Sequence, residues 1–324
     1  MKAFESFLAP KLEEYIEHRL SLGYTNRNIR SVLRSFDNYT KENADDWGSF
    51  QPKFFIELRK NLKGEPSTVN GVLSGVRTFF QFLKHQGHYP HNPLQDIPPL
   101  PLGQYFPFIF SSEKVDELLL LIKKRVLSTH ENDLEYVSTY IAILLIARCG
   151  LRISEPPRIL LTHYCQEEGT IYIEKTKFQN NRLIPVPNSA LVEINKFLTI
   201  RKSLLQYENN PYLLIGQKQK PLSKFDIYHI FHKAVKGIGI NQTKLKKANI
   251  TFGAPVPHSL RHSFAVNTLK SIKERGKSVW DALSILSVYM GHRNLTSTMR
   301  HLTVLDAQHR QNIFNFIIFN QEEI

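Results

Sequence analysis

The sequence predicts a mainly α-helical protein with a small β-sheet, an α+β arrangement spread over two domains. Apolar residues recur at helical spacing through most of the 324 residues, a length that suits two domains. A proline-rich stretch near residue 100 interrupts the helical pattern. One later segment, 169–187, alternates apolar and polar residues up to a polar turn and then resumes as a short strand, which is typical of a β-hairpin.

The first 98 residues are predicted to form helices only. The first helix carries an apolar stripe that consists of Leu8, Leu12, Tyr15, Ile16 and Leu20. Gly23 ends this helix, and Thr25 can cap the next one, which carries arginines without acidic partners four residues away. Such a row is usually a solvated face, but the lack of acidic partners raises the odds that it meets phosphates. The row consists of Arg27, Arg30 and Arg34. Further helices are expected over 52–62 and from Ser67 to Gly87.

A composition shift follows the first domain. Its prolines exclude helix and favour an extended connection, so we predict a linker over 99–110 and a second domain over 111–324. Besides the hairpin, the second domain should contain helices over 134–150, 188–198, 223–235, 258–272 and 278–290. The closing segment, 306–320, is amphipathic and too apolar for an uncovered tail.

The charge of the chain indicates a polyanionic partner. Lys and Arg number 42 against 29 Asp and Glu, which gives a formal charge of +13. Nucleic acid is favoured over a membrane surface, because the basic residues are spread over the whole chain. No stretch is long and apolar enough to span a bilayer, and acids within the first helix argue against a signal peptide. The only cysteines, Cys149 and Cys165, imply no disulfide framework and fit a reducing cytoplasm.

Three stretches suggest chemistry. In "CGLRISEPPRI", Arg152 follows the end of a buried helix, where a guanidinium is costly without an anion. In "PHSLRHSFA", His258 and Arg261 stand three residues apart, so one helical turn aims both at one point. In "MGHRN", His292 follows Gly291 at the end of another apolar helix. Taken singly, each has an ordinary explanation as a salt-bridged arginine or a helix-capping histidine.

Together and in this order, the stretches resemble the tyrosine recombinases, also called phage integrases. "GLRISE" is similar to the first arginine box of that family, "HSLRHSFA" to its His-x-x-Arg box, "MGHRNLTST" to its Gly-His box and "RLIP" to the strand of its hairpin. The resemblance covers nearly the whole chain. It implies a helical core-binding domain over 1–98 and a DNA breaking-rejoining catalytic domain over 111–324. The implied catalytic residues are Arg152, Lys177, His258, Arg261 and His292, with Lys175 as the competitor if the hairpin register slips.

These residue types suit metal-independent cleavage of DNA. The guanidiniums of Arg152 and Arg261 can bind the charge that develops on the non-bridging phosphate oxygens. Lys177 can protonate the departing 5′ oxygen, His258 can shuttle the proton of the nucleophile, and His292 can hydrogen-bond a phosphate oxygen. No cofactor is needed for this chemistry.

Two neighbouring positions allow more than one interpretation. Glu155 is expected to brace Arg152 or the histidine of its box, although a simple helix-start acid fits the position nearly as well. His258 and His262 form an i,i+4 pair like those of zinc helices. The glutamate of a His-Glu-x-x-His motif is absent, however, and Arg261 would repel a cation, so we expect no metal.

The tyrosine that gives the family its name is missing. Counting from His292 places the nucleophile at His301, and no tyrosine follows Tyr289, which lies on the wrong side of the Gly-His pair. A replaced nucleophile in an otherwise intact recombinase is favoured, because every other member of the set survives. A degenerate member that binds DNA without cutting is the second interpretation. Attack by histidine itself ranks last, because imidazole is shorter than a phenol.

The resemblance also implies partners and a role. We expect a C-shaped clamp on duplex DNA at specific recombination sites, dimers on each site and a tetramer in the synapse, with protomers joined through 306–320. Since no arm-binding domain precedes the helical domain, a recombinase of a mobile element in a bacterial cytoplasm, associated with the nucleoid, is the favoured function. A non-catalytic DNA-binding protein and a type IB topoisomerase-like activity are the alternatives.

Overall fold

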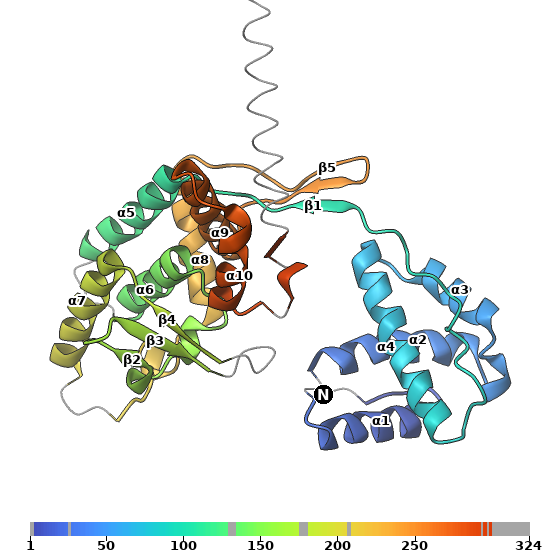
Figure 1. Ribbon diagram of the computed structural model, residues 1–324. Helices are drawn as coiled ribbons and strands as arrows, with labels where there is room; N and C mark the ends of the chain where they lie inside the picture. The colour runs from blue at the N-terminus through green and yellow to red at the C-terminus, as the bar shows by residue number, and fades with distance from the viewer. Residues whose placement is uncertain are drawn as a thin grey trace, which may run out of the picture. The chain divides into compact units, whose positions relative to one another are not determined.

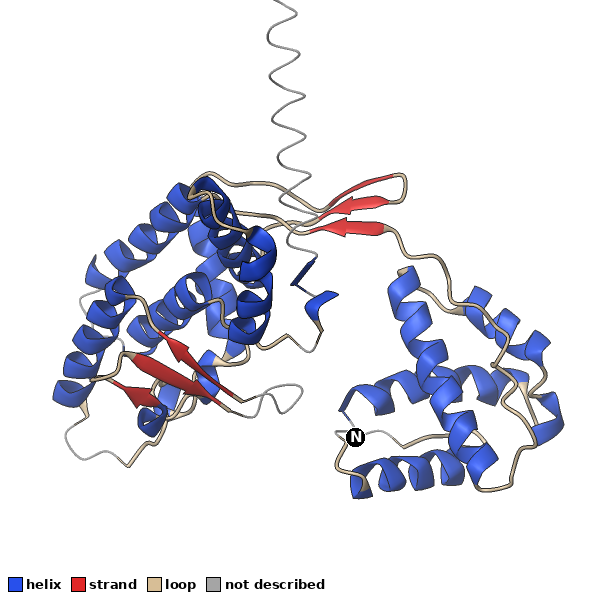
Figure 2. Ribbon diagram, in the orientation of Figure 1, coloured by secondary structure: helices blue, strands red, loops and turns tan. Residues whose placement is uncertain are grey.

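The structure is a computed structural model, and it describes residues 3–24, 27–128, 134–174, 181–205, 209–292, 294–296 and 298–299. Contacts divide the chain into two compact units, Met1–Gly103 and Gln104–Ile324, a division that falls within the stretch expected to be the linker. Helices dominate both units, and the second contains two small sheets (Figure 2). The predicted fold class is therefore confirmed. No helix of the described segments is long and apolar enough to cross a membrane.

The first unit is a group of helices (Figure 1) that packs around a cluster of phenylalanine rings. Its helices are α1 (Ala9–Ser21), α2 (Arg27–Asn43), α3 (Pro52–Asn61) and α4 (Pro66–His85), with a 3₁₀ turn, η1 (Trp47–Ser49). Phe80 is fully buried, and its ring centroid lies 6.1 Å from that of Phe36 and 5.2 Å from that of Phe55. Offset and edge-on ring pairs of this kind add about 0.5–1.5 kcal/mol each beyond simple burial. The aromatic content of the sequence thus fixes the centre of this unit.

The helices of the first unit match the predicted ones closely. Gly23 adopts a φ of +79°, a left-handed conformation that ends α1 at little cost. Leu20, the last residue of the apolar stripe, is 56% exposed near the end of the helix. Thr25, the expected cap of α2, lies outside the described residues. At Gly75, α4 packs so closely on α2 that a Cβ would collide with Val32 Cγ1.

The second unit is organised around one buried helix (Figure 1). Its helices are α5 (Ser112–Ser128), α6 (Leu134–Cys149), α7 (Asn188–Leu204), α8 (Lys224–Gly237), α9 (Pro257–Glu274) and α10 (Val279–Met290). Three short 3₁₀ turns are η2 (Pro156–Arg158), η3 (Leu161–His163) and η4 (Gln217–Gln219). α6 packs against α5, α7, α8 and α9, which explains why its sequence is apolar on all sides. Of these helices, α5 was not predicted from the sequence.

One sheet is the predicted hairpin with an added strand. β2 (Tyr164–Cys165), β3 (Thr170–Ile173) and β4 (Arg182–Pro185) are antiparallel, with Ile171 opposite Ile184. The hairpin over 169–187 is therefore confirmed for its two strands, whereas residues 175–180 lie outside the described residues. Both isoleucines face the core, and their neighbours along each strand face outward.

The other sheet was not predicted. β1 (Gln104–Phe106) lies parallel to β6 (Ile250–Phe252), which forms a hairpin with β5 (Leu245–Lys247). Part of the stretch expected to be a linker is thus a strand of the second unit. It packs closely, because a Cβ on Gly253 would collide with the Tyr105 hydroxyl. Three-residue strands are too short to show an alternating pattern, so the sequence gives no sign of them.

Candidate active site

The C-terminal end of α10 is the centre of the candidate site. Gly291 closes this helix with a φ of +64°, and the closing turn uses the carbonyls of Ser287 and Val288. The next three carbonyl oxygens, those of Tyr289, Met290 and Gly291, each accept a hydrogen bond from an arginine. We call these three oxygens the carbonyl cradle. A helix C-terminus carries partial negative charge, so it stabilises cations placed there.

Two of the arginines were predicted from the sequence. Arg152 follows α6 and donates from Nη2 to the Gly291 oxygen. Arg261 lies in the first turn of α9 and donates from Nη2 to the Met290 oxygen over 2.7 Å, and from Nη1 to the Gly150 oxygen. Arg261 is fully buried, whereas the Arg152 side chain is partly exposed. The fold thus brings both predicted guanidiniums to adjacent carbonyls of one helix end.

Glu155 lies among these charges. Its carboxylate accepts bonds from the Arg152 backbone N–H over 2.8 Å and from Arg152 Nη1 over 2.9 Å. It also accepts bonds from Arg182 Nη1 over 3.1 Å and Nη2 over 2.9 Å. Burial alone would raise the pKa of Glu155, but hydrogen bonds and charge from Arg182 and Arg152 outweigh it and hold the pKa below its usual value. Glu155 is therefore ionised, and it contacts Arg152 as the sequence suggested.

Arg182 is the residue that sequence reasoning missed. It begins β4, is buried, and donates from Nε to the Tyr289 oxygen over 2.8 Å. Its side chain lies on the same face of the strand as that of Ile184, which is buried. The alternation of "RLIP" could have revealed it, because an arginine in phase with an inward-facing isoleucine must find a buried partner.

The predicted histidines lie beside the arginines. His258 occupies the first turn of α9, and its ring meets that of His262 edge-on at 4.7 Å. Burial of the ring, with the charges of Arg261 and Arg152, lowers the pKa of His258 to about 4, although much of the residue remains exposed. It is therefore neutral at neutral pH. His292 follows Gly291, and its Nδ1 lies 2.8 Å from Thr298 Oγ1.

The side chain of Tyr289 is held by contacts within the second unit. Its hydroxyl donates to the Pro185 oxygen over 3.2 Å, and its ring stacks on Phe264 with centroids 5.7 Å apart. Burial raises the pKa of Tyr289 and raises that of the neighbouring Cys149 thiol to about 12. Both groups are therefore held protonated inside the protein.

Several predicted residues are not placed by the structure. Lys177, Lys175 and His301 lie outside the described residues, as does the segment 306–320. The side chain of Arg27, at the start of α2, is likewise not described.

The arginine row on α2 is partly neutralised by another helix. Arg30 pairs with Glu13 of α1 and lies over the Phe4 ring, with 5.0 Å from its guanidinium carbon to the ring centroid. Arg34 is partly buried on the same helix. The acidic partner came from a neighbouring helix, so a search for acids four residues away could not find it.

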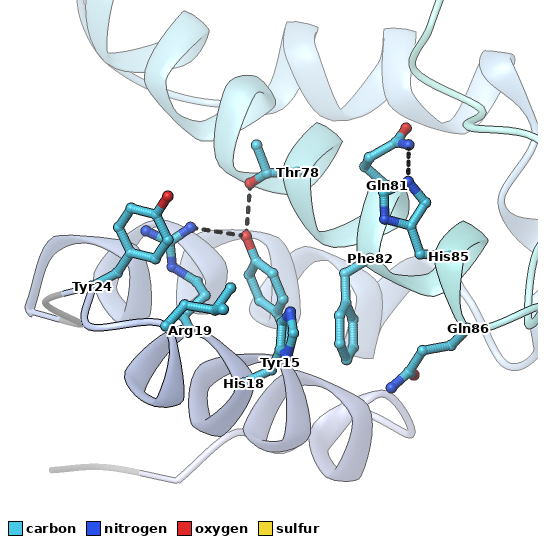
Figure 3. A pocket seen from close by; sticks show the side chains of 10 residues that line it. Tyr15, His18, Arg19, Tyr24, Thr78, Gln81, Phe82, His85 and Gln86 are labelled. Carbon is cyan, nitrogen blue, oxygen red and sulfur yellow. Dashed lines mark hydrogen bonds between the residues drawn. The ribbon is translucent and has the colours of Figure 1, made fainter.

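In the described part of the chain, no group of three His, Cys, Asp or Glu residues could hold a metal ion. A pocket between α1 and α4 of the first unit contains aromatic and basic side chains (Figure 3). Its polar groups contact one another, since Tyr15 donates to Thr78 over 2.8 Å and Arg19 lies over the Tyr24 ring. It contains no acid–base pair.

Comparison with known proteins identifies the family. The sequence model of the phage integrase family matches residues 122–308, which is more than half of the chain and includes the carbonyl cradle and all three arginines. This chain belongs to the phage integrase family. The phage integrase family comprises the tyrosine recombinases, which are DNA strand transferases. The resemblance to tyrosine recombinases that the sequence motifs indicated is therefore confirmed at the level of the family.

Similar proteins span both units of this phage integrase. Tyrosine recombinase XerA of Pyrococcus horikoshii is 25% identical over 307 residues, which cover 93% of this chain and 92% of that protein. The fold is similar to that of XerH site-specific recombinase in a post-cleavage complex, with a TM-score of 0.65 at 19% identity, covering 87% of this chain and 76% of that one. A lambda integrase dimer bound to a COC′ core site gives 0.64 at 16% identity, covering 91% and 76%.

Proposed function

We propose that this chain recognises specific DNA sites and is built to cut and rejoin DNA by metal-independent transesterification. The observation that carries the proposal is the carbonyl cradle, which holds Arg152 and Arg261 side by side although they come from distant parts of the chain. Arg152 and Arg182 bind the carboxylate of Glu155, and Arg261 adds a third guanidinium at the next carbonyl, so the cluster has surplus positive charge. Such a cluster suits a DNA phosphate. The proposal that this recombinase acts for a mobile element is supported only by the resemblance to integrases.

The described residues have distinct roles in this proposal. Arg152 and Arg261 bind the non-bridging oxygens of the scissile phosphate, and their charge stabilises the pentacoordinate transition state. His258, neutral because its pKa is lowered to about 4, accepts the proton of the attacking hydroxyl. His292, oriented by Thr298, hydrogen-bonds a further phosphate oxygen. Glu155 orients Arg152 through hydrogen bonds to its backbone N–H and to Nη1.

Two proposed participants lie outside the described residues. Lys177, between β3 and β4, protonates the departing 5′ oxygen, with Lys175 as the alternative. His301 stands at the position of the nucleophile, so the chain as given is cleavage-defective. Two observations support a replaced nucleophile in an otherwise intact site. The other cationic residues are all present, whereas mutations that accumulate after loss of function would have removed several of them. In addition, the hydroxyl of Tyr289 is hydrogen-bonded to the Pro185 oxygen.

The test is covalent trapping on nicked suicide substrates. Sites are first selected from random duplexes by binding to this protein, and the selected sites are then nicked next to the cleavage position. His301→Tyr should form a covalent 3′-phosphotyrosyl complex, whereas the chain as given should form none. His301→Phe is the matched control, because it has nearly the size of tyrosine without the hydroxyl. A tyrosine variant that binds the site and forms no adduct would contradict the proposal.

The same experiment separates the other interpretations. A non-catalytic DNA-binding protein, which the absence of tyrosine after Tyr289 favours, gains nothing from His301→Tyr. Relaxation of plasmids by that variant without sequence preference would indicate topoisomerase-like activity instead. An adduct from the chain as given, stable to alkali and labile to acid, would indicate a phosphohistidine at His301.

Assembly on DNA is the remaining part of the proposal. We assign DNA binding to the helical domain 1–98 with Arg27, Arg30 and Arg34, where Arg30 must exchange Glu13 for a phosphate. The linker 99–110 joins it to the catalytic domain 111–324, and the segment 306–320 joins protomers into dimers and a tetramer. Deletion after Asp306 should leave single-site binding intact and abolish cooperative assembly. Unchanged cooperativity would refute this assignment.

A further inference from the structure

Arg182 connects three parts of the second unit at the candidate site. Its Nη1 and Nη2 donate to the two oxygens of Glu155 over 3.1 and 2.9 Å, and its Nε donates to the Tyr289 oxygen over 2.8 Å. A guanidinium can make a bidentate contact through Nη1 and Nη2 and still donate a third hydrogen bond from Nε. Strand β4, the 3₁₀ turn after Arg152 and the end of α10 therefore meet on a single residue.

The contact also decides how Glu155 affects Arg152. A carboxylate next to Arg152 competes with any phosphate for that guanidinium, because both are anions that accept from the same N–H groups. Arg182 donates to both oxygens of Glu155, the same two that accept from Arg152, so it offsets the negative charge that Arg152 meets there. Three arginines and one glutamate leave two surplus positive charges, and loss of Arg182 would leave one.

Backbone packing holds Arg182 in place. A Cβ added to Gly291 would lie 3.1 Å from Arg182 Nη1 and 3.3 Å from its Cδ, so the arginine stem lies directly against the end of α10. The left-handed φ of +64° at Gly291 favours glycine, and an added Cβ would push the Arg182 side chain away by a few tenths of an ångström. The turn at Gly291, which precedes His292, therefore packs against the aliphatic part of the Arg182 side chain, and each restricts the position of the other.

We propose that Arg182 is a positioning residue for phosphate binding, an inference that rests on the proposed role of Arg152. It neutralises Glu155, keeps the positive charge of Arg152 available to the scissile phosphate, and fixes the base of the β3–β4 hairpin against the carbonyl cradle. Arg182 touches no reacting atom in this scheme.

The test measures binding of inorganic phosphate to the full chain, by calorimetry at low salt and by the rise in Tm. Arg182→Gln should weaken phosphate binding by about 10-fold or more, since one of two surplus charges is lost. The double variant Arg182→Gln, Glu155→Gln restores the charge balance, so its affinity should return to within about 3-fold of the parent. A residue that served the fold alone would make the double variant worse than either single one.

Controls keep the outcomes distinct. Arg201→Gln removes another buried arginine of this unit, one that donates to the Asn210 and Tyr212 carbonyls, and should lower Tm without weakening phosphate binding. If Arg182→Gln does not fold, Arg182→Lys is measured instead. An ammonium cannot span Glu155 and the Tyr289 oxygen together, so phosphate binding should again weaken, by about 3-fold or more.

Three results would count against the ideas separately. Parent protein that binds no phosphate, or binds it equally after Arg261→Gln, contradicts the proposed function. Parent protein that binds phosphate at the Arg261 site while the Arg182 variants bind equally well overturns the positioning role. A double variant weaker than Arg182→Gln overturns it as well.

Discussion

Arg152 and Arg261 donate hydrogen bonds to adjacent carbonyl oxygens, those of Gly291 and Met290 at the end of α10. Two guanidiniums repel each other at such proximity, and the negative end of the helix and Glu155 offset only part of this repulsion. Burial, together with the charges of Arg152 and Arg182, lowers the pKa of Arg261 to about 9, so it remains charged at neutral pH. The protein thus holds surplus positive charge in a state that an anion would stabilise.

The planar fork of each arginine should matter more than its charge. Arg152→Lys and Arg261→Lys keep the charge and lose the bidentate geometry. In the His301→Tyr background, each should slow single-turnover cleavage of the suicide substrate by about 10²–10³-fold. DNA affinity should change by less than about 3-fold, because a single phosphate contact contributes little to total binding. Equal losses in cleavage and in affinity would show that the arginines merely bind DNA.

The glycine at the end of α10 offers a matched pair of substitutions. Gly291 and Gly276 have similar left-handed φ angles of +64° and +69°, but only Gly291 lies against Arg182. Each change to alanine should lower the free energy of unfolding by about 1–2 kcal/mol. Only Gly291→Ala should also weaken phosphate binding, because its Cβ displaces the Arg182 stem. Equal phosphate binding by the two variants would disprove the link between the turn and the site.

The sequence predicted those features that arise from local pattern. Apolar residues at helical spacing identified α4 and α9, and alternation identified the β3–β4 hairpin. It also indicated Arg152 and Arg261, because each stands in a recognisable box.

Features that depend on long-range contacts escaped prediction. β1 exists only because β6 lies beside it, and three residues carry no pattern of their own. Arg182 gains its importance from Glu155 and from the Tyr289 carbonyl, which are distant in sequence. Likewise, Glu13 of α1 pairs with Arg30 across two helices. Periodicity describes which face of an element is buried, and it does not identify the partner.

The lowered pKa of His258 predicts acid sensitivity. The ordinary pKa of histidine is near 6.5, whereas desolvation and the charges of Arg261 and Arg152 lower the pKa of His258 to about 4. As pH falls through this window, the unfolded state binds the proton first, so the free energy of unfolding should decrease. His258→Gln should reduce this decrease between pH 7 and pH 5, as measured by urea unfolding.

Between pH 7 and pH 5, the effect of His258 on stability can be distinguished from that of Glu155. The pKa of Glu155 is lowered, so its contribution is present above the ordinary carboxyl pKa and is lost only at more acidic pH. Measurements above pH 5 therefore report mainly on histidine. His229, exposed on α8, is replaced in the same way as the control. Equal pH dependence of the parent and His258→Gln would show that the ring is solvated.

The contact between α2 and α4 provides a test of the first unit. Gly71 and Gly75 lie on α4, but a Cβ at Gly71 would meet open space, whereas one at Gly75 would collide with Val32. Gly71→Ala should raise the free energy of unfolding by about 1 kcal/mol, because alanine favours helix. Gly75→Ala should lower it by about 1–3 kcal/mol through overpacking.

A second-site change on α2 distinguishes overpacking from other causes of this loss. Val32→Ala removes the Cγ1 atom that the new Cβ would meet, so in the Gly75→Ala background it should recover part of the lost stability. The two tryptophans, Trp47 and Trp280, lie in different units, and Trp280 is 65% exposed. In a Trp280→Phe background, Trp47 fluorescence during urea unfolding therefore reports the first unit alone. If Val32→Ala lowers the stability of Gly75→Ala further, the two helices do not meet at this glycine.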